Sequence, residues 1–304
     1  MRANENITRA VAKTWQSKPT VEGAGVHLKR AFGFSEVPQL DPFLLLDAFR
    51  SENPEDYKRG FPWHPHRGIE TITYLLEGEV EHGDSLGNRG IISAGDVQWM
   101  TAGGGIIHQE MPKGDGKGQM WGFQLWSNLP ARDKMMAPRY RELTRDQIPQ
   151  VTTEDGAMVR VICGEVEGVR GPVREIVTDP EFLDVSLPAG KSFAHKTKSD
   201  HTLFAYVIEG EGYFDPRHSP LAGENYLDKA RSRAFAEGTV VLYGSGHEIV
   251  VATDKRTVRF LLVSGTPLKE PIAWHGPIVM NTQEQLRIAF EEYQRGTFVK
   301  HDQA

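Results

Sequence analysis

Cysteine is almost absent from the sequence, with Cys163 alone among 304 residues. One thiol cannot form an intrachain disulfide, and it excludes a closed structural zinc site built from clustered thiolates. The sequence also has no apolar run long enough to span a bilayer, and residues 1–15 are polar and of mixed charge, unlike a signal peptide. We therefore expect no membrane partner. The expected location is the cytoplasm, and in a eukaryote the nucleus as well.

The sequence also lacks a large excess of charge of one sign. The 41 acidic residues outnumber the 35 basic residues to give a formal net charge of −6, and the basic residues are scattered along the chain. A nucleic-acid surface usually needs clustered lysine and arginine side chains. The composition therefore predicts no direct binding to nucleic acid.

Glycine and proline are abundant, at 31 and 18 residues, and they separate short segments typical of strands and turns. The segments Tyr74–Glu79 (YLLEGE) and Tyr206–Glu211 (YVIEGE) are nearly the same, which indicates an internal duplication. The length suits two domains. We therefore predict an all-β protein with two copies of one barrel.

The boundaries between these parts follow from composition. A proline-bearing and charged stretch after residue 128 predicts a linker, placed at 136–150, with a short helical turn at Thr144–Gln147. The predicted domains are then residues 1–135 and 151–304. Near the C-terminus, Asn281–Glu284 offers an N-cap with a glutamate three residues on, and an apolar stripe at helical spacing follows, which predicts a short helix packed on a barrel. The stripe consists of Leu286, Ala289, Phe290 and Tyr293.

Two clusters of metal-ligating residue types lie in the first half. His64 and His66 are two residues apart, and so are His108 and Glu110. Residues two apart in a strand project from the same face, so each pair can point into one cavity. Imidazole and carboxylate ligands suit iron, nickel, manganese, cobalt or zinc. The spacing therefore predicts one mononuclear divalent metal in the first barrel.

The residues around these clusters resemble the pirin family of the cupin superfamily. The resemblance lies in HPHRGIETITYLLEGEVEHGDSLGNRG from His64 and AGDVQWMTAGGGIIHQEMP from Ala94, and it continues more loosely into the second half. It implies two tandem cupin barrels of the double-stranded β-helix or jelly-roll type with a short C-terminal helix. It also implies one bound metal ion, with iron(II) as the leading candidate and with His64, His66, His108 and Glu110 as its ligands.

A second carboxylate competes for the fourth position. Glu70 stands four residues after His66, the spacing at which ordinary cupins have their glutamate, and it has the same parity as His64 and His66. The pirin resemblance favours Glu110 instead. Glu70 would then be a carboxylate behind the metal ligands or one that pairs strands, and it would hold an imidazole N–H or Arg67.

Three functions fit such a site. The pirin resemblance implies a dioxygenase of quercetin (flavonol) 2,3-dioxygenase type, in which Glu110 doubles as the base and the partners are a small aromatic or enolisable substrate and dioxygen. The alternatives are a metal- or redox-dependent regulator, such as a transcription coregulator, that binds partner proteins, and a non-oxidative cupin metalloenzyme. A metal site with free coordination positions is what catalysis needs, so the enzyme is favoured. We expect the chain to be a monomer.

Other residues are candidates for the surroundings of the metal. Arg67 and Gln124 are predicted neighbours of the pocket. Four large side chains are candidates for its wall, although packing in the barrel core is the favoured reading of them: Phe43, Trp63, Met100 and Trp121. In the second barrel, His195 and Thr197 occupy the place of His64 and His66, and His247 falls near that of His108. A second metal site from His195, His201 and His247 is disfavoured, because no carboxylate stands near them at ligand spacing.

Overall fold

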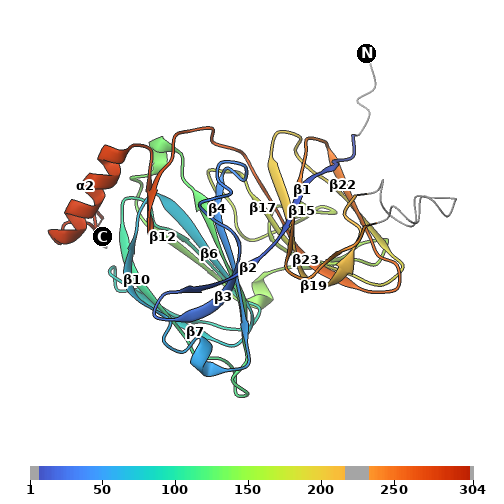
Figure 1. The fold of residues 1–304 in the computed structure, drawn as a ribbon, viewed down its shortest axis with the longest axis horizontal. Helices are drawn as coiled ribbons and strands as arrows, with labels where there is room; N and C mark the ends of the chain where they lie inside the picture. The colour runs from blue at the N-terminus through green and yellow to red at the C-terminus, as the bar shows by residue number, and fades with distance from the viewer. Residues whose placement is uncertain (1–6, 216–232, 302–304) are drawn as a thin grey trace, which may run out of the picture. The chain divides into compact units, whose positions relative to one another are not determined.

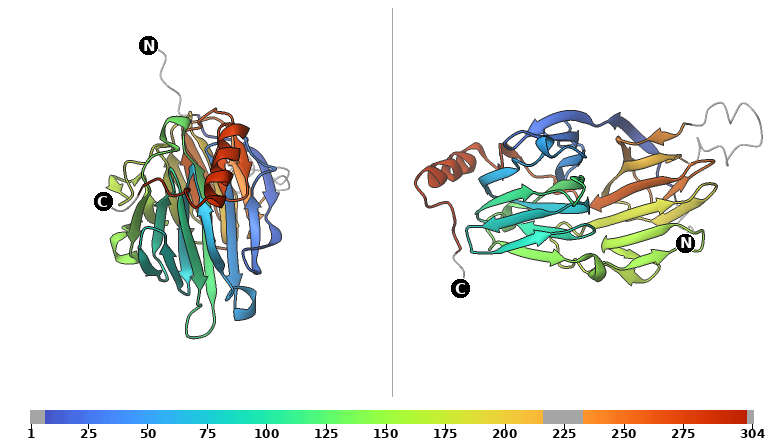
Figure 2. Two further views of the ribbon diagram at one scale, coloured as in Figure 1. Left: turned by 90° about the vertical axis from the view of Figure 1, so that its left-hand side faces the viewer. Right: turned by 90° about the horizontal axis from the view of Figure 1, so that it is seen from below.

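The computed structural model describes residues 7–215 and 233–301. In these residues the chain is mostly β-structure with an α-helix near the C-terminus (Figure 1), and Figure 2 gives two further views. The prediction of an all-β chain with a short C-terminal helix is thereby confirmed. Within the described ranges, no helix combines the length and apolar character needed to cross a membrane.

The chain forms two compact units. We call residues 18–147 together with 268–301 the first barrel, and residues 7–17 together with 148–215 and 233–267 the second barrel. These units do not match the predicted domains 1–135 and 151–304. The strand Val11–Gln16, near the N-terminus, pairs with a strand of the second barrel, and the C-terminal segment packs with the first barrel. Each unit is therefore built from separate stretches of the chain.

The first barrel is made of antiparallel strands in a larger and a smaller sheet, followed by a separate pair of short strands. The strands are β2 (Lys18–Glu22), β3 (Val26–Phe32), β4 (Phe43–Ser51), β5 (Phe61–His66), β6 (Ile69–Glu77), β7 (Val80–Asp84), β8 (Arg89–Ile92), β9 (Val97–Thr101), β10 (Ile106–Pro112), β11 (Met120–Asn128), β12 (Arg139–Leu143), β24 (Ala273–His275) and β25 (Ile278–Met280). The larger sheet has the order β12-β9-β6-β11-β4-β3-β2, and the smaller has the order β5-β10-β7-β8. The strands β24 and β25 pair with each other.

The second barrel repeats this plan with a main sheet and smaller strand pairs. Its strands are β1 (Val11–Gln16), β13 (Gln150–Thr152), β14 (Met158–Cys163), β15 (Glu165–Val166), β16 (Val169–Arg170), β17 (Glu181–Leu187), β18 (Ser192–Lys196), β19 (Thr202–Gly212), β20 (Phe235–Ala236), β21 (Thr239–Tyr243), β22 (Glu248–Ala252) and β23 (Val258–Gly265). The main sheet has the order β1-β21-β19-β23-β17-β14-β13, with β20 paired to β19, while β18 pairs with β22 and β15 with β16.

The predicted linker 136–150 contains regular structure. Its strand β12 pairs with β9 in the larger sheet of the first barrel, through Arg139 opposite Thr101 and Leu143 opposite Val97. A 3-10 turn, η3 (Arg145–Gln147), follows and confirms the predicted helical turn. Two further 3-10 turns of the first barrel are η1 (Pro54–Asp56) and η2 (Ala131–Asp133). Most of the linker therefore belongs to the first barrel.

The C-terminal helix is α2 (Gln283–Gln294), drawn in red in Figure 1. Thr282 is its N-cap and forms a capping box with Gln285, one residue later than predicted. The buried side chains Leu286 and Ala289 pack into a core cluster with β24 and β25, while Tyr293 is 38% exposed. The predicted packing of the helix on a barrel is confirmed.

A candidate metal centre in the first barrel

Three imidazoles converge inside the first barrel. The strands β5 and β10 are antiparallel neighbours, and their register puts His108 directly opposite His64. The two-residue period of β5 brings His66 to the same side as His64. His64 Nε2 lies 3.1 Å from His66 Nε2 and 3.0 Å from His108 Nε2. Among the described residues these three histidines form the group that could hold a metal ion.

Backbone carbonyls set the proton positions on two of the rings. His64 Nδ1 lies 2.8 Å from Pro62 O, and His66 Nδ1 lies 3.0 Å from Pro277 O. A carbonyl oxygen only accepts hydrogen bonds, so each Nδ1 carries the proton and each Nε2 presents a lone pair. His108 Nδ1 is buried without a hydrogen-bond partner in the described part of the chain.

The donor set fits a cation. Two Nε2 lone pairs that face each other cannot hydrogen-bond to one another, and a cation between them would relieve their repulsion. Burial lowers the pKa of His64, and burial with the neighbouring imidazoles lowers the pKa values of His66 and His108 well below the usual range. Neutral imidazoles are the form that binds metals, so the residues present suit the metal that the sequence predicts.

Glu110 lies beside this group but makes a different contact. Its carboxylate Oε1 accepts a hydrogen bond from Thr73 Oγ1 at 3.2 Å, and the residue lines the same cavity as His64 and His66. Burial raises the pKa of Glu110 to about 7, a rise that the Thr73 hydrogen bond partly offsets. Its oxygens are not among the tightly grouped ligand atoms of the three imidazoles.

Glu70 has its own partner on the larger sheet. It stands opposite Thr101 in the pairing of β6 with β9, and its Oε1 accepts a hydrogen bond from Thr101 Oγ1 at 2.7 Å. It is not one of the residues that line the cavity beside His64 and His66. The parity shared with the histidines does not bring Glu70 to them, because a turn at Arg67 and Gly68 separates β5 from β6.

His64, His66 and Glu110 line a largely apolar cavity of about 750 Å³. Gln124 lines it as predicted, whereas the four candidate wall residues do not, and of these Phe43 and Met100 are core residues while Trp63 is half exposed. Inward-facing positions follow the alternation along β11, where Trp126 stands two residues after Gln124; that period could have identified it. The aromatic and apolar wall consists of Val26, Leu28, Phe34, Leu45, Phe49, Tyr57, Phe61, Val80, Trp126 and Trp274.

Arg67 is not a neighbour of the cavity. Its side chain is 2% exposed, donates to Phe298 O at 2.7 Å and forms an ion pair with Glu292 at 2.7 Å. The guanidinium carbon also lies 4.2 Å from the centre of the Phe298 ring. The prediction for Arg67 is therefore wrong, because the residue anchors the C-terminal segment next to His66.

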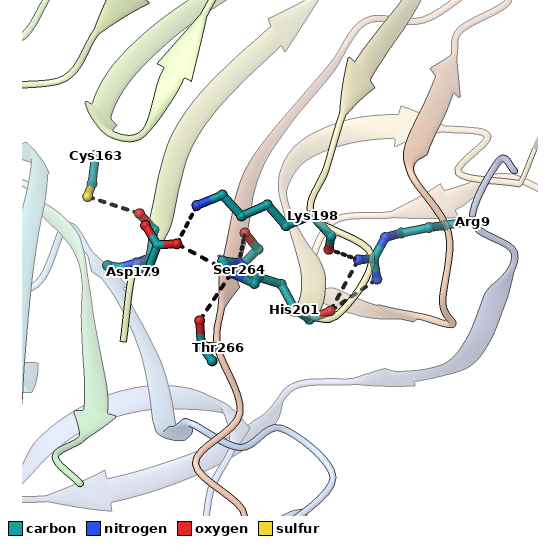
Figure 3. A network of polar contacts seen from close by, with 8 residues as sticks. Arg9, Cys163, Asp179, Lys198, His201, Ser264 and Thr266 are labelled. Carbon is teal, nitrogen blue, oxygen red and sulfur yellow. Dashed lines mark hydrogen bonds and ion pairs between the residues drawn. The ribbon is translucent and has the colours of Figure 1, made fainter. Parts of the chain in front are cut away.

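The histidines of the second barrel have other partners. His195 Nε2 lies 2.9 Å from Glu181 Oε1. His201 contacts Thr266 Oγ1 at 3.1 Å and Ser264 Oγ at 3.4 Å, in the network of Figure 3. In residues 7–215 and 233–301, none of these histidines belongs to a group that could hold a metal ion.

Register also corrects the predicted counterpart of His108. In the second barrel Ile249, not His247, stands opposite His195. The position that matches His66 is Thr197, whose Oγ1 accepts a hydrogen bond from Arg9 Nε at 2.8 Å. The guanidinium of Arg9 also donates to the carbonyls of Lys198, His201 and Gly244, as Figure 3 shows in part.

Two family models match the chain. Residues 25–127 match the model described as Pirin, and residues 182–299 match the one described as the Pirin C-terminal cupin domain. A "Pirin-like protein" of Caulobacter vibrioides is 43% identical over 95% of this chain and 99% of its own length. A "Putative quercetin 2,3-dioxygenase" of Pseudomonas aeruginosa is 40% identical over 95% of this chain and 97% of its own length.

A solved structure shares the fold of this chain, and with the two family models it confirms the predicted pair of cupin barrels. The crystal structure of a quercetin 2,3-dioxygenase from Acinetobacter baumannii superposes with a TM-score of 0.83 at 30% sequence identity. The match covers 96% of this chain and 100% of that chain.

Proposed function

Because the chain belongs to the pirin family, we propose that it is a metal-dependent dioxygenase of quercetin 2,3-dioxygenase type. The observation that carries the proposal is the convergence of three imidazoles, two of them buried, at the edge of an aromatic-lined cavity. A metal bound by side chains on one side only keeps positions for exogenous ligands. A site of this kind suits catalysis better than a structural role.

We assign the metal to His64, His66, His108 and Glu110. A bound divalent metal, with iron(II) as the leading candidate, would act as a Lewis acid toward a substrate hydroxyl and would react with dioxygen. His64 and His66 contribute Nε2 lone pairs, held in direction by Pro62 O and Pro277 O. Glu110, which Thr73 holds on the cavity wall, takes the proton of the substrate hydroxyl.

The apolar wall binds and shields the substrate. Trp126 and Trp274 line the cavity with their ring centroids 6.1 Å apart, and the Trp126 and His66 ring centroids lie 5.1 Å apart with the rings nearly perpendicular. A flat aromatic ligand gains contact area against such rings and displaces water from the reacting hydroxyl. This chemistry fits a flavonol or another aromatic enol.

The test is anaerobic reconstitution with iron(II), nickel(II), cobalt(II) and manganese(II), followed by oxygen-electrode recording with quercetin. Uptake above the free-metal control that disappears in His66→Ala is the expected result. One bound metal per chain without uptake would refute the dioxygenase. It would shift the assignment to a metal-dependent regulator acting through protein partners, or to a non-oxidative cupin metalloenzyme.

A further inference from the structure

A row of polar side chains crosses the larger sheet of the first barrel, starting at Glu110. Thr73 on β6 stands opposite Gln124 on β11, Gln124 opposite Asp47 on β4, and Asp47 opposite Arg30 on β3. All four residues line the same cavity as Glu110. Partners in register share one face of a sheet, so this polar row runs across an otherwise apolar wall.

The row is hydrogen-bonded at both ends. Thr73 Oγ1 lies 2.7 Å from Gln124 Oε1 and 3.2 Å from Glu110 Oε1. At the other end Arg30 grips Asp47 in a bidentate pair, with Nε to Oδ1 at 2.9 Å and Nη2 to Oδ2 at 2.7 Å. Asp47 is 5% exposed. Its position is therefore held by the pair with Arg30, and its carboxylate faces the cavity from a fixed geometry.

Asp47 keeps acceptor capacity after this pairing. A carboxylate offers about four lone-pair directions, and the two bonds from Arg30 use two of them. Arg30 also forms an ion pair with Glu22 at 2.9 Å, so one guanidinium serves two carboxylates and the cluster as a whole is negative. Apart from histidines, Arg30 is the basic side chain among the residues that line the cavity. The far end of the cavity therefore suits a hydrogen-bond donor and repels an anion.

The spacing sets the size of the ligand. Neighbouring strands lie about 4.8 Å apart, so the two strand steps from Thr73 to Asp47 span roughly 10 Å. Val26, Leu28 and Phe49 line the cavity around this end. A flat ligand of two or three rings reaches from the metal to Asp47 and is apolar between its ends.

We propose that Asp47, held by Arg30, is a specificity subsite that accepts a hydrogen bond from a phenolic hydroxyl on the ring most distant from the metal. This inference rests on the proposed function and deepens it, because it selects neutral, distally hydroxylated aromatic substrates over unsubstituted and carboxylated ones. Gln124, between Thr73 and Asp47, orients the ligand edge along the row.

The first measurement compares ligands on the zinc-loaded, full-length protein under nitrogen, where no turnover occurs. Quenching of tryptophan fluorescence gives Kd for galangin, kaempferol and quercetin, which carry zero, one and two hydroxyls on the distal ring. A hydrogen bond to a buried carboxylate predicts that quercetin binds about tenfold more tightly than galangin. A galangin derivative with a 4′-carboxylate is expected to bind more weakly than galangin itself.

The variants assign this preference to one carboxylate. Asp47→Asn should reduce the quercetin-to-galangin ratio to about twofold, since a neutral acceptor bonds more weakly. The double variant Arg30→Met with Asp47→Leu avoids leaving an unpaired buried guanidinium, and it should abolish the ratio while galangin still binds. Asp184→Asn is the matched control, because Asp184 forms the same bidentate pair with Arg259 at 2.9 and 2.6 Å in the second barrel. It should leave the ratio unchanged.

A second ligand pair separates this subsite from the proposed function. Biphenyl and 4-hydroxybiphenyl carry no metal-binding group, so their Kd values test Asp47 without the flavonol chemistry. Equal binding within both ligand families, or a hydroxyl preference that survives both Asp47 variants, would overturn the subsite. If flavonols fail to bind while 4-hydroxybiphenyl shows an Asp47-dependent preference, the subsite stands and the dioxygenase falls.

Discussion

The two barrels share a strand plan but differ in what fills them. In the second barrel one continuous cluster of buried apolar side chains occupies the interior, with Phe260 between Phe193 and Phe214 at centroid distances of 6.3 and 5.1 Å. In the first barrel the buried apolar residues form separate clusters beside a cavity of about 750 Å³. The duplicated fold therefore has a packed apolar interior in one copy and a largely apolar cavity beside the histidines in the other. The second barrel also has a hollow of about 730 Å³, but it is lined mainly by polar residues such as Lys198 and His201.

The same contrast holds at the positions of the histidines. His64 faces His108 across β5 and β10, whereas His195 faces Ile249 across β18 and β22. Where the first barrel has His66, the second has Thr197, which holds Arg9. His195 directs Nε2 to the Glu181 carboxylate, so this nitrogen carries the proton and, unlike Nε2 of His64, presents no lone pair to a shared cation. Metal binding depends on the whole group, and the second barrel keeps only part of it.

The largest effect is expected on metal content, when His108 of the first barrel is replaced by isoleucine, the residue that Ile249 provides at the corresponding position of the second barrel. His108→Ile removes one of three converging nitrogens and should lower metal content from one ion per chain to nearly none, measured by inductively coupled plasma mass spectrometry after dialysis. The matched change His195→Ala in the second barrel should leave metal content unaltered. Equal metal loss in both variants would contradict the assignment of the site to the first barrel.

The next effect separates the two glutamates. Glu110→Gln should weaken metal binding by about 10- to 100-fold, because the carboxylate beside the imidazoles is replaced by a neutral amide. Glu70→Gln should change it little, since Glu70 bonds Thr101. Competition with a chromogenic chelator gives both affinities. The reverse order would make Glu70 the fourth ligand.

The free energy of unfolding should distinguish the packed interior of the second barrel from the cavity of the first barrel. Phe260→Ala leaves a hole in a continuous core and should lower the free energy of unfolding of the second barrel by about 3–5 kcal/mol. Phe49→Ala removes a half-buried side chain at the edge of the cavity and should cost about 1–2 kcal/mol. Guanidinium titrations followed by circular dichroism measure both. Equal losses would mean that the first barrel is packed as tightly as the second.

The smallest effect concerns pH in the second barrel. Burial first, and then the nearby Lys198, lowers the pKa of His201, against the opposing influence of Asp179, Asp200 and Glu181. Below the ordinary value of about 6.5 the unfolded state takes up the proton before the folded state does. The lowered pKa of His201 therefore makes its full contribution to the free energy of unfolding above about pH 6.5, and this contribution is lost as the pH falls below that value.

His201→Asn is the variant that isolates this contribution. It should lose less stability than the wild type between pH 7 and pH 5.5, measured by guanidinium titration at each pH. An identical loss in both proteins would show that His201 takes up its proton equally readily in the folded and unfolded states.

Local patterns predicted a large part of the fold and of the site. Alternation along strands and glycine-rich turns predicted the two barrels, and the two-residue spacing of His64 and His66 predicted imidazoles on one face. Local patterns failed where partners are distant. Arg67 was misplaced because Glu292 and Phe298, more than 200 residues away, hold its side chain. The favoured core reading of the large side chains is confirmed for Phe43, Met100 and Trp121, but the aromatic residues that do line the cavity, such as Trp274, come from segments distant in the sequence.

The sequence by itself determined the residue types, their spacing and the duplication, because these are properties of neighbours along the chain. Only the tertiary structure decided that β1 joins the second barrel and that the C-terminal segment joins the first. It also placed Pro277 O against His66 and aligned Thr73, Gln124, Asp47 and Arg30 into one row. Such contacts arise from strand register and long-range packing, which local periodicity does not encode.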